Sequence, residues 1–163
     1  MLIRPLHPTT DRALVERFFT AASDYIRLER DEDPGPDVTD EFFSDAPPGC
    51  DPATSHRLGL FQADALVALA EMAVGYPEPT DAYLGLMIVH PDARGSGAGA
   101  ILLTHLETLA RAHPARRLFL AVLDANPRGR AFWERQGFTL AQANRPVTLG
   151  TKTQLAHRLV KPL

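Results

Sequence analysis

The stretch from Val89 to Ala100 holds the residues whose types and spacing most clearly point to chemistry. It reads Val-His-Pro-Asp-Ala-Arg-Gly-Ser-Gly-Ala-Gly-Ala, with an apolar run from Leu84 before it and a helix predicted over 98–112 after it. A turn that opens a helix leaves backbone N–H groups free at the positive end of the helix dipole. Such groups bind phosphate oxygens, and glycine allows a ligand to approach the backbone closely. A flexible glycine turn without a ligand is the alternative.

Two common phosphate-binding motifs fit this turn poorly. A Walker A motif needs a lysine followed by Ser or Thr after its glycines, and Ala100-Ile101 stands there instead. A dinucleotide fingerprint fits Gly95 to Ala100, with Asp124 in place of the ribose-binding carboxylate. However, residues 90–94 separate the strand from the glycines, and too little chain follows Asp124 to complete a doubly wound sheet. The sequence therefore disfavours nucleotide triphosphatases and dinucleotide-dependent enzymes.

A second block of residues, read together with the turn, resembles a known family. Arg94 to Gly99 has the form Arg/Gln-x-x-Gly-x-Gly/Ala and resembles the pyrophosphate loop of the GNAT family of acetyl-coenzyme A-dependent N-acetyltransferases. The segment from Asn126 to Phe138 reads Asn-Pro-x-x-x-Ala-Phe-Trp-x-x-x-Gly-Phe and is similar to that family's Asn-x-x-Ala-x-x-Phe/Leu-Tyr-x-x-x-Gly-Phe segment. Both blocks stand in the family's order and at its separation, and the resemblance covers about 58–160.

The resemblance implies that acetyl-coenzyme A binds at the glycine turn. Its pyrophosphate would lie among the backbone N–H groups of the turn, where Arg94 would add charge or brace the loop. Its pantetheine arm would pair with backbone groups of Met87, Ile88 and Val89, in an opening between the fourth and fifth strands. Asn126 would cap a helix and also reach the cofactor. The expected cofactor-binding residues are Met87, Ile88, Val89, Arg94, Gly95, Ser96, Gly97, Ala98, Gly99, Ala100, Asn126 and Trp133.

The implied reaction is direct attack of a neutral amine on the thioester, with the carbonyl oxygen held by a backbone N–H near Met87. An amine is mostly protonated at neutral pH, so a base must remove its proton. Glu71 is the candidate base, because it is a carboxylate on a predicted strand whose apolar neighbours would raise its pKa. The alternative is a Glu71 at a strand edge that faces water or pairs with an arginine. His90 is expected to be a surface residue of the turn.

Trp133 departs from the family pattern, which has at this position a tyrosine that protonates the departing thiolate. An indole N–H donates hydrogen bonds but is no workable acid. Tyr83 or Tyr76 could take over this role, and the other proton sources are water and the departing ammonium. The predicted catalytic residues are therefore Glu71 and Tyr83. The departure also keeps open a second function, a coenzyme A-binding sensor or regulatory module without turnover.

The elements that must position these residues follow from hydrophobic periodicity and from breakers. We expect helices over 11–22, 98–112 and 126–136, and strands over 2–6, 57–62, 65–74, 82–89, 117–123, 138–141 and 154–160. Helices alternate with strands only in the middle of the chain, and hairpins lie on both sides of it. The expected fold class is α/β (α+β). A GNAT-type mixed, mostly antiparallel sheet of six or seven strands would be splayed between strands four and five, with helices on both faces.

The segment from Asp24 to Pro52 lacks a clear period and holds several prolines. We expect a mostly solvated loop, with a short helix around 40–44. Its acidic cluster would favour a cationic acceptor, such as a polyamine, an aminoglycoside or a basic peptide N-terminus, if it lines the acceptor site. The members of this cluster are Glu29, Asp31, Glu32 and Asp33.

Length and composition predict one domain over 1–163 with an ordinary core. A net charge of −3 gives no general attraction to nucleic acid or to an anionic membrane. No apolar run approaches the length of a signal or transmembrane segment, so we expect a cytoplasmic protein. The single cysteine, Cys50, and the spacing of the histidines predict no disulfide and no metal. The expected partner is a small-molecule or peptide amine, and the family resemblance implies a homodimer formed through the late strands.

Overall fold

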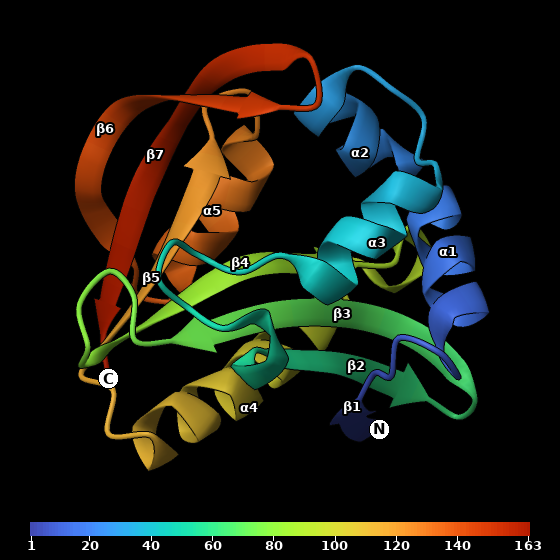
Figure 1. Cartoon of the computed structure of the whole chain (residues 1–163), viewed down its shortest axis with the longest axis horizontal. Coiled ribbons are helices and arrows are strands. Elements are labelled where there is room, and N and C mark those ends of the chain that lie inside the picture. Colours follow the sequence, from blue (N-terminus) through green and yellow to red (C-terminus); the bar gives the residue numbers. More distant parts are fainter.

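The computed structural model describes residues 1–163. Seven strands form one sheet with the order β1-β2-β3-β4-β5-β7-β6 (Figure 1). The strands are β1 (Leu2–Pro5), β2 (His56–Gln62), β3 (Ala65–Val74), β4 (Asp81–Val89), β5 (Arg117–Leu123), β6 (Thr139–Leu149) and β7 (Lys152–Pro162). The helices are α1 (Arg12–Ala21), α2 (Ser23–Arg30), α3 (Pro36–Ser44), α4 (Ala98–Ala112) and α5 (Pro127–Arg135), with short 3₁₀ turns η1 (Pro52–Thr54) and η2 (Pro91–Ala93).

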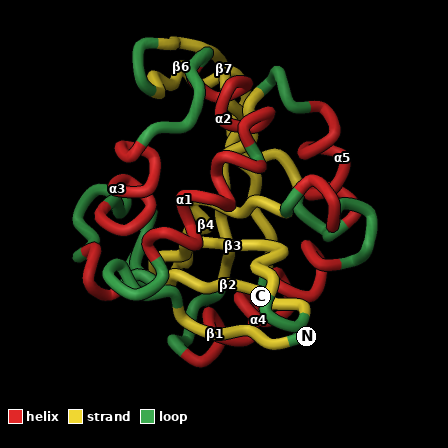
Figure 2. Tube along the Cα trace, turned by 90° about the vertical axis from the view of Figure 1, so that its right-hand side faces the viewer, coloured by secondary structure: helices red, strands yellow, loops and turns green.

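Helices cover both faces of the sheet, as Figure 2 shows with α1 and α3 on one side and α5 on the other. The fully buried Leu102 and Leu106 of α4 join a core that includes Trp133 of α5. On the opposite face, Phe19 of α1 and Phe42 of α3 belong to a second core that includes β-strand side chains. The strands between the two cores are apolar on both faces, as a sheet buried on both sides requires. The predicted mixed sheet with helices on both faces is confirmed.

The junction of β4 and β5 creates the opening on which the site depends. These two strands are parallel, and they pair only from Asp81 to Leu84 with Arg117 to Leu120. The completely buried Asp81 anchors the paired end through a two-bonded ion pair with Arg117, at 2.8 and 2.9 Å. Beyond Leu84 no ladder joins the strands, so the backbone of both lies free on the facing sides.

A β-bulge in β4 lies just where the two strands begin to diverge. Glu71 of β3 faces Leu86, and the next residue of β3 faces Leu84, so Gly85 is the extra residue. A bulge bends the strand and increases its twist. The bend carries the rest of β4 away from β5.

The expectation of a mostly solvated loop over 24–52 is wrong, because most of α2 and all of α3 lie within it, although the short helix expected around 40–44 falls inside α3. Tyr25 and the buried Ile26 give α2 an apolar face against the second core. Three of the four members of the acidic cluster form ion pairs, and Glu32 forms none. These pairs join Glu29 to Arg30, Asp31 to Lys152 and Asp33 to Arg27.

The last two strands are longer than the predicted 138–141 and 154–160. No residue of β6 is buried, so its sequence lacks the alternation that marks a half-buried strand. The hairpin of β6 and β7 ends against α2, where the side-chain amide of Gln154 donates to the carbonyls of Leu28 and Glu29. This contact closes one wall of the site. No helix in the structure has the length and apolar character that a membrane span requires.

Candidate active site

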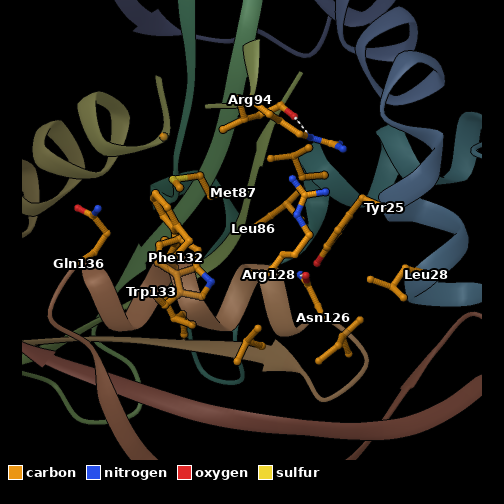
Figure 3. Close-up of a pocket in the computed structure, with 18 of the residues that line it drawn as sticks. Tyr25, Leu28, Leu86, Met87, Arg94, Asn126, Arg128, Phe132, Trp133 and Gln136 are labelled. Carbon is orange, nitrogen blue, oxygen red and sulfur yellow. Dashed lines mark hydrogen bonds between the residues drawn. The ribbon is translucent and has the colours of Figure 1, made fainter. Parts of the chain in front are cut away.

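A first cavity of about 740 Å³ opens where β4 and β5 diverge (Figure 3). Its walls are the free edges of both strands, the glycine turn and the beginning of α5. Every residue predicted to bind the cofactor lines this cavity except Ser96. The Ser96 hydroxyl instead donates to the Ala93 carbonyl and stabilises the turn from outside, at 2.6 Å.

The glycine turn has the backbone geometry of an anion cradle. Gly95 and Gly97 have φ angles of +79° and +90°, in the left-handed region that favours glycine. The first main-chain bond that spans the start of α4 runs from the Ile101 N–H to the Gly97 carbonyl. The N–H groups over 98–100 therefore have no intrahelical acceptor and lie at the positive end of the helix dipole.

Gly99 also sets how closely α4 approaches its neighbours. A methyl group on this residue would meet the Phe132 ring at 3.2 Å and the Val89 side chain at 3.4 Å. Because these contacts are tight, a larger residue would push the helix start away from β4 and α5. The turn would then lose its position above the cavity.

Arginines give the first cavity an excess of positive charge. Three arginines and one aspartate line it. Arg94 binds Asp24 of α2 through two hydrogen bonds of 2.5 and 2.9 Å, and it also donates to the Val89 carbonyl at 3.2 Å. This pair holds the pKa of Asp24 below its usual range. Arg94 therefore braces the turn against α2, which is one of the two roles considered from the sequence.

Arg128 and Arg135, both on α5, were missed at the sequence level. They line the first cavity and take part in none of the ion pairs of the structure. Figure 3 shows Arg128 and Tyr25 reaching into the cavity from opposite walls. The only signal in the sequence was the position of Arg128 two residues after the capping Asn126.

Asn126 and Trp133 are both engaged in contacts with the protein itself. The Asn126 side chain accepts a bond from the Gly129 N–H at 2.9 Å and so caps α5. Trp133 is only 9% exposed and packs edge to face with Phe132 and Phe138. Its indole therefore forms part of the cavity wall and of the core together.

A second cavity, of about 370 Å³, adjoins the first. It lies among α2, α3, the middle of the sheet and the hairpin of β6 and β7. The residues that line both cavities are Tyr25, Gly85, Leu86, Ala121 and Leu123. The bulge at Gly85 is therefore part of this junction, the wall that the two cavities share.

Glu71 lies in the wall of the second cavity, beside this junction. It is 7% exposed, forms no ion pair, and its Oε1 has no hydrogen-bond partner. Its other oxygen, Oε2, occupies the space that a Cβ on Gly85 would need. Burial raises the pKa of Glu71, against the opposing influence of the Ser55 hydroxyl and the Arg57 charge. The alternative of a solvent-facing or arginine-paired Glu71 is thus contradicted.

Tyr83 and Tyr76 lie together on another wall of the second cavity, with ring centroids 5.2 Å apart. The guanidinium of Arg158 donates to the Tyr76 hydroxyl at 3.2 Å and lies 5.7 Å from the Tyr83 ring centroid. Arg158 forms no ion pair, and its Nε has no partner. Burial raises the pKa of Tyr83, while the Arg158 charge acts in the opposite direction. Arg158 was also missed, because nothing near it in sequence indicates this contact.

His90 lies outside both cavities. Its Nδ1 accepts a bond from the Asp92 N–H at 3.2 Å, and its half-buried ring packs edge to face with Phe18. Cys50 lies outside both cavities as well, and its thiol donates to the Val74 carbonyl. Neither residue is placed to act on a group at the junction.

Comparison with known proteins agrees with this geometry. The model of the GNAT acetyltransferase family matches residues 16–138. An acetyltransferase from Thermus thermophilus is 28% identical, with a TM-score of 0.76 over 100% of this chain and 98% of its own. The ribosomal-protein-S18-alanine N-acetyltransferase from Escherichia coli is 21% identical, with a TM-score of 0.71 over 99% of this chain and 92% of its own.

A ribosomal-protein-alanine N-acetyltransferase from Brucella melitensis has the same fold, at 17% identity and a TM-score of 0.73 over the full length of both chains. No curated protein sequence matches the chain. The family match covers most of the sequence, including the glycine turn and the start of α5. The chain therefore belongs to the GNAT family of acetyltransferases.

Proposed function

We propose that this protein is an acetyl-coenzyme A-dependent N-acetyltransferase that acetylates a primary amine by direct attack within a ternary complex. The observation that carries the proposal is the set of residues shared by the two cavities, which includes Gly85 of the bulge. One cavity offers the amides that open α4 and two arginines outside any ion pair, and the other offers a buried carboxylate outside any ion pair. Two structural relatives are named as ribosomal-protein alanine N-acetyltransferases, which supports an amine on a small molecule or peptide as acceptor.

The lining of the first cavity suits acetyl-coenzyme A through its positive charge and its free backbone edges. The amides that open α4 would hold the pyrophosphate, and Arg128 and Arg135 would lie near its phosphates. At Met87, Ile88 and Val89, β4 does not pair with β5, so the backbone groups on that side are available to the pantetheine amides. The thioester supplies the activated acetyl group. In the proposed complex, the thioester lies at the junction, beside Gly85 and Leu86.

Glu71 would act as the general base. Its carboxylate lines the second cavity and forms no ion pair, so it would accept a proton from the acceptor's ammonium group, and this exposes the nitrogen lone pair for attack. Its raised pKa brings it nearer to that of the group from which it takes the proton. Glu71 then passes the proton to solvent.

Tyr83 would act as the acid. As the C–N bond forms and the C–S bond breaks, the Tyr83 hydroxyl donates a proton to the departing thiolate. The nitrogen then loses its second proton to solvent, and a proton from solvent restores the Tyr83 hydroxyl. The Arg158 guanidinium favours the transient phenolate, because it is a cation beside the ring without a carboxylate partner.

The test is release of coenzyme A thiol from acetyl-coenzyme A by the purified protein with pools of primary amines. We expect release with at least one pool and its loss in Glu71→Gln, while that variant still binds coenzyme A. Binding of coenzyme A without thiol release from any pool would contradict the proposal. That result would favour the sensor function suggested by Trp133.

A further inference from the structure

The carboxylates of the second cavity lack enough partners in the chain. Four carboxylates and a single arginine line it. Arg30 is held by Glu29 at 2.8 Å and by Glu41 at 2.7 Å, so these three side chains form a closed group. Glu71 and Asp45 are left without an ion-pair partner. The cavity therefore has two negative groups that no side chain of the protein neutralises directly.

Arg57 lies near both of these carboxylates but bonds elsewhere. Its three donor groups bind the backbone carbonyls of Phe42, Pro52 and Asp45, at 2.7, 2.6 and 2.9 Å. Its charge weakens the negative potential at the two carboxylates, but it forms no ion pair with either of them. Arg57 also fixes the loop after α3, so the position of Asp45 at the cavity rim is set by a rigid contact.

The two carboxylates differ in depth. Glu71 is buried beside the junction, with an unpartnered oxygen. Asp45, the C-cap residue of α3, is exposed at the rim. They lie close enough for the charge of Asp45 to contribute to the raised pKa of Glu71.

The walls that share the cavity with the two carboxylates are mostly apolar. They include Phe42 of α3, Tyr83 and Leu86 of β4, Val147 and Leu149 of β6, and Pro47, Pro48 and Tyr76 from loops. Such walls accommodate methylene groups, and they disfavour a charged group among them. No unpaired cation lines the cavity to receive an acceptor carboxylate.

From this arrangement we infer that the acceptor is an aliphatic diamine, with its reacting nitrogen at Glu71 and its second ammonium group at Asp45. The inference rests on the proposed acetyl transfer and adds the class of acceptor to it. A buried carboxylate can serve as the base for any amine acceptor, whereas a second unpaired carboxylate, exposed at the rim of the same cavity, suits a second cation. An acceptor with a carboxylate at its far end would be repelled by Asp45.

The experiment compares three amines of matched chain length in the thiol-release assay: cadaverine, pentylamine and aminocaproate, which end in an ammonium, a methyl and a carboxylate group. An alanyl peptide amide serves as a peptide acceptor. We expect kcat/KM for cadaverine to exceed that for pentylamine about fivefold, as an ion pair at a partly exposed site allows. Aminocaproate should fall below pentylamine.

A variant then tests whether Asp45 is the source of the preference for cadaverine. Asp45→Asn should reduce the ratio of kcat/KM for cadaverine over pentylamine to about two, the statistical advantage of a substrate with two equivalent amines. Asp64→Asn is the matched control, because Asp64 is an exposed carboxylate in the turn between β2 and β3, outside both cavities. This control should keep the wild-type ratio. The melting temperature of both variants establishes that they are folded.

The outcomes separate this inference from the proposed function. Thiol release from pentylamine or the peptide equal to that from cadaverine overturns the diamine assignment and leaves acetyl transfer standing. A preference for cadaverine that is undiminished in Asp45→Asn overturns the role of Asp45, and with it the inference. Absence of release from every amine overturns both proposals.

Discussion

The two cavities that meet at the Gly85 bulge are opposite in charge and in construction. The first has three arginines and one aspartate, and much of its wall is backbone: the glycine turn and the free edges of β4 and β5. The second has four carboxylates and one arginine, and its wall consists of side chains from helices and strands far apart in sequence. An anionic group therefore favours the first cavity and a cationic group the second. In the proposed function, this difference in charge directs the anionic cofactor to the first cavity and the cationic amine to the second.

The strongest test of this division is the substitution of Glu71, the buried carboxylate beside the junction. Glu71→Gln should lower kcat by roughly 10²- to 10⁴-fold, because it removes the base but keeps the shape of the side chain. The KM for acetyl-coenzyme A should stay within about twofold, since Glu71 does not line the first cavity. Steady-state kinetics of both substrates measures the two effects separately. A rise in the KM for acetyl-coenzyme A as large as the fall in kcat would contradict the separate roles of the two cavities.

The raised pKa of Glu71 makes the same variant informative about pH. The wild-type rate should fall as pH drops through this raised pKa, because only the carboxylate can accept a proton. Stability has the opposite sense: below the unfolded pKa the group is neutral in both states, and stability is lost as pH rises through the folded pKa. Glu71→Gln should thus be more stable than wild type at neutral pH but not near pH ~4. Thermal unfolding at both pH values checks this.

Tyr83→Phe should have the second largest effect. It removes the proposed acid, and we expect kcat to fall roughly tenfold to a hundredfold, with water as the remaining proton source. The matched control is Trp133→Phe, which changes the position where relatives have a tyrosine and should leave kcat within about threefold. Presteady-state measurement of thiol release compares the two. A kcat for Tyr83→Phe no lower than that for Trp133→Phe would contradict the assignment of the acid to Tyr83.

Gly97→Ala tests whether the turn binds through its backbone. Alanine at φ +90° strains the turn by about 1–2 kcal/mol, and we expect the KM for acetyl-coenzyme A to rise roughly tenfold. Gly49→Ala is the matched control, because Gly49 has a φ of +79° and, like Gly97, open space around its Cβ position. Both variants should lose similar stability in thermal melts. A cofactor KM that rises equally in both would show that the turn has no special role.

The smallest expected effect concerns the charge of the first cavity. Arg128→Gln should raise the KM for acetyl-coenzyme A about two- to fivefold, and the difference should shrink at high salt. Arg130→Gln is the control from the same helix, because Arg130 pairs with Glu134 and does not line the cavity. It should leave the KM unchanged. A salt-independent change would point to packing rather than charge.

The contrast between the cavities also explains what the sequence could reveal. The first cavity is built from short continuous segments, and a glycine turn followed by a helix is visible without any tertiary information. The single exception, Ser96, faces the turn itself, as its bond to Ala93 shows. The resemblance likewise pointed to the free edge of β4, because the contact is made by backbone and needs no particular side chain.

The second cavity could not be assembled in this way. Its walls combine α2, α3, β3, β4, β6 and β7, and only the fold brings Tyr83 near Arg158. The acidic cluster over 29–33 was noticed for its composition, yet three of its members pair with arginine or lysine. Asp45 and Glu71, which lie outside this cluster, are the carboxylates of the second cavity that form no ion pair. Composition reports how many charges a segment has, whereas the fold decides which of them are neutralised.

A crystal structure with coenzyme A bound tests the central claim most directly. The account predicts that the pyrophosphate accepts hydrogen bonds from amides over 97–100 and that the pantetheine arm pairs with β4 at Met87 to Val89. The sulfur should then lie at the junction, facing the second cavity beside Glu71. A coenzyme A molecule bound elsewhere, or with its sulfur directed away from the second cavity, would contradict the account.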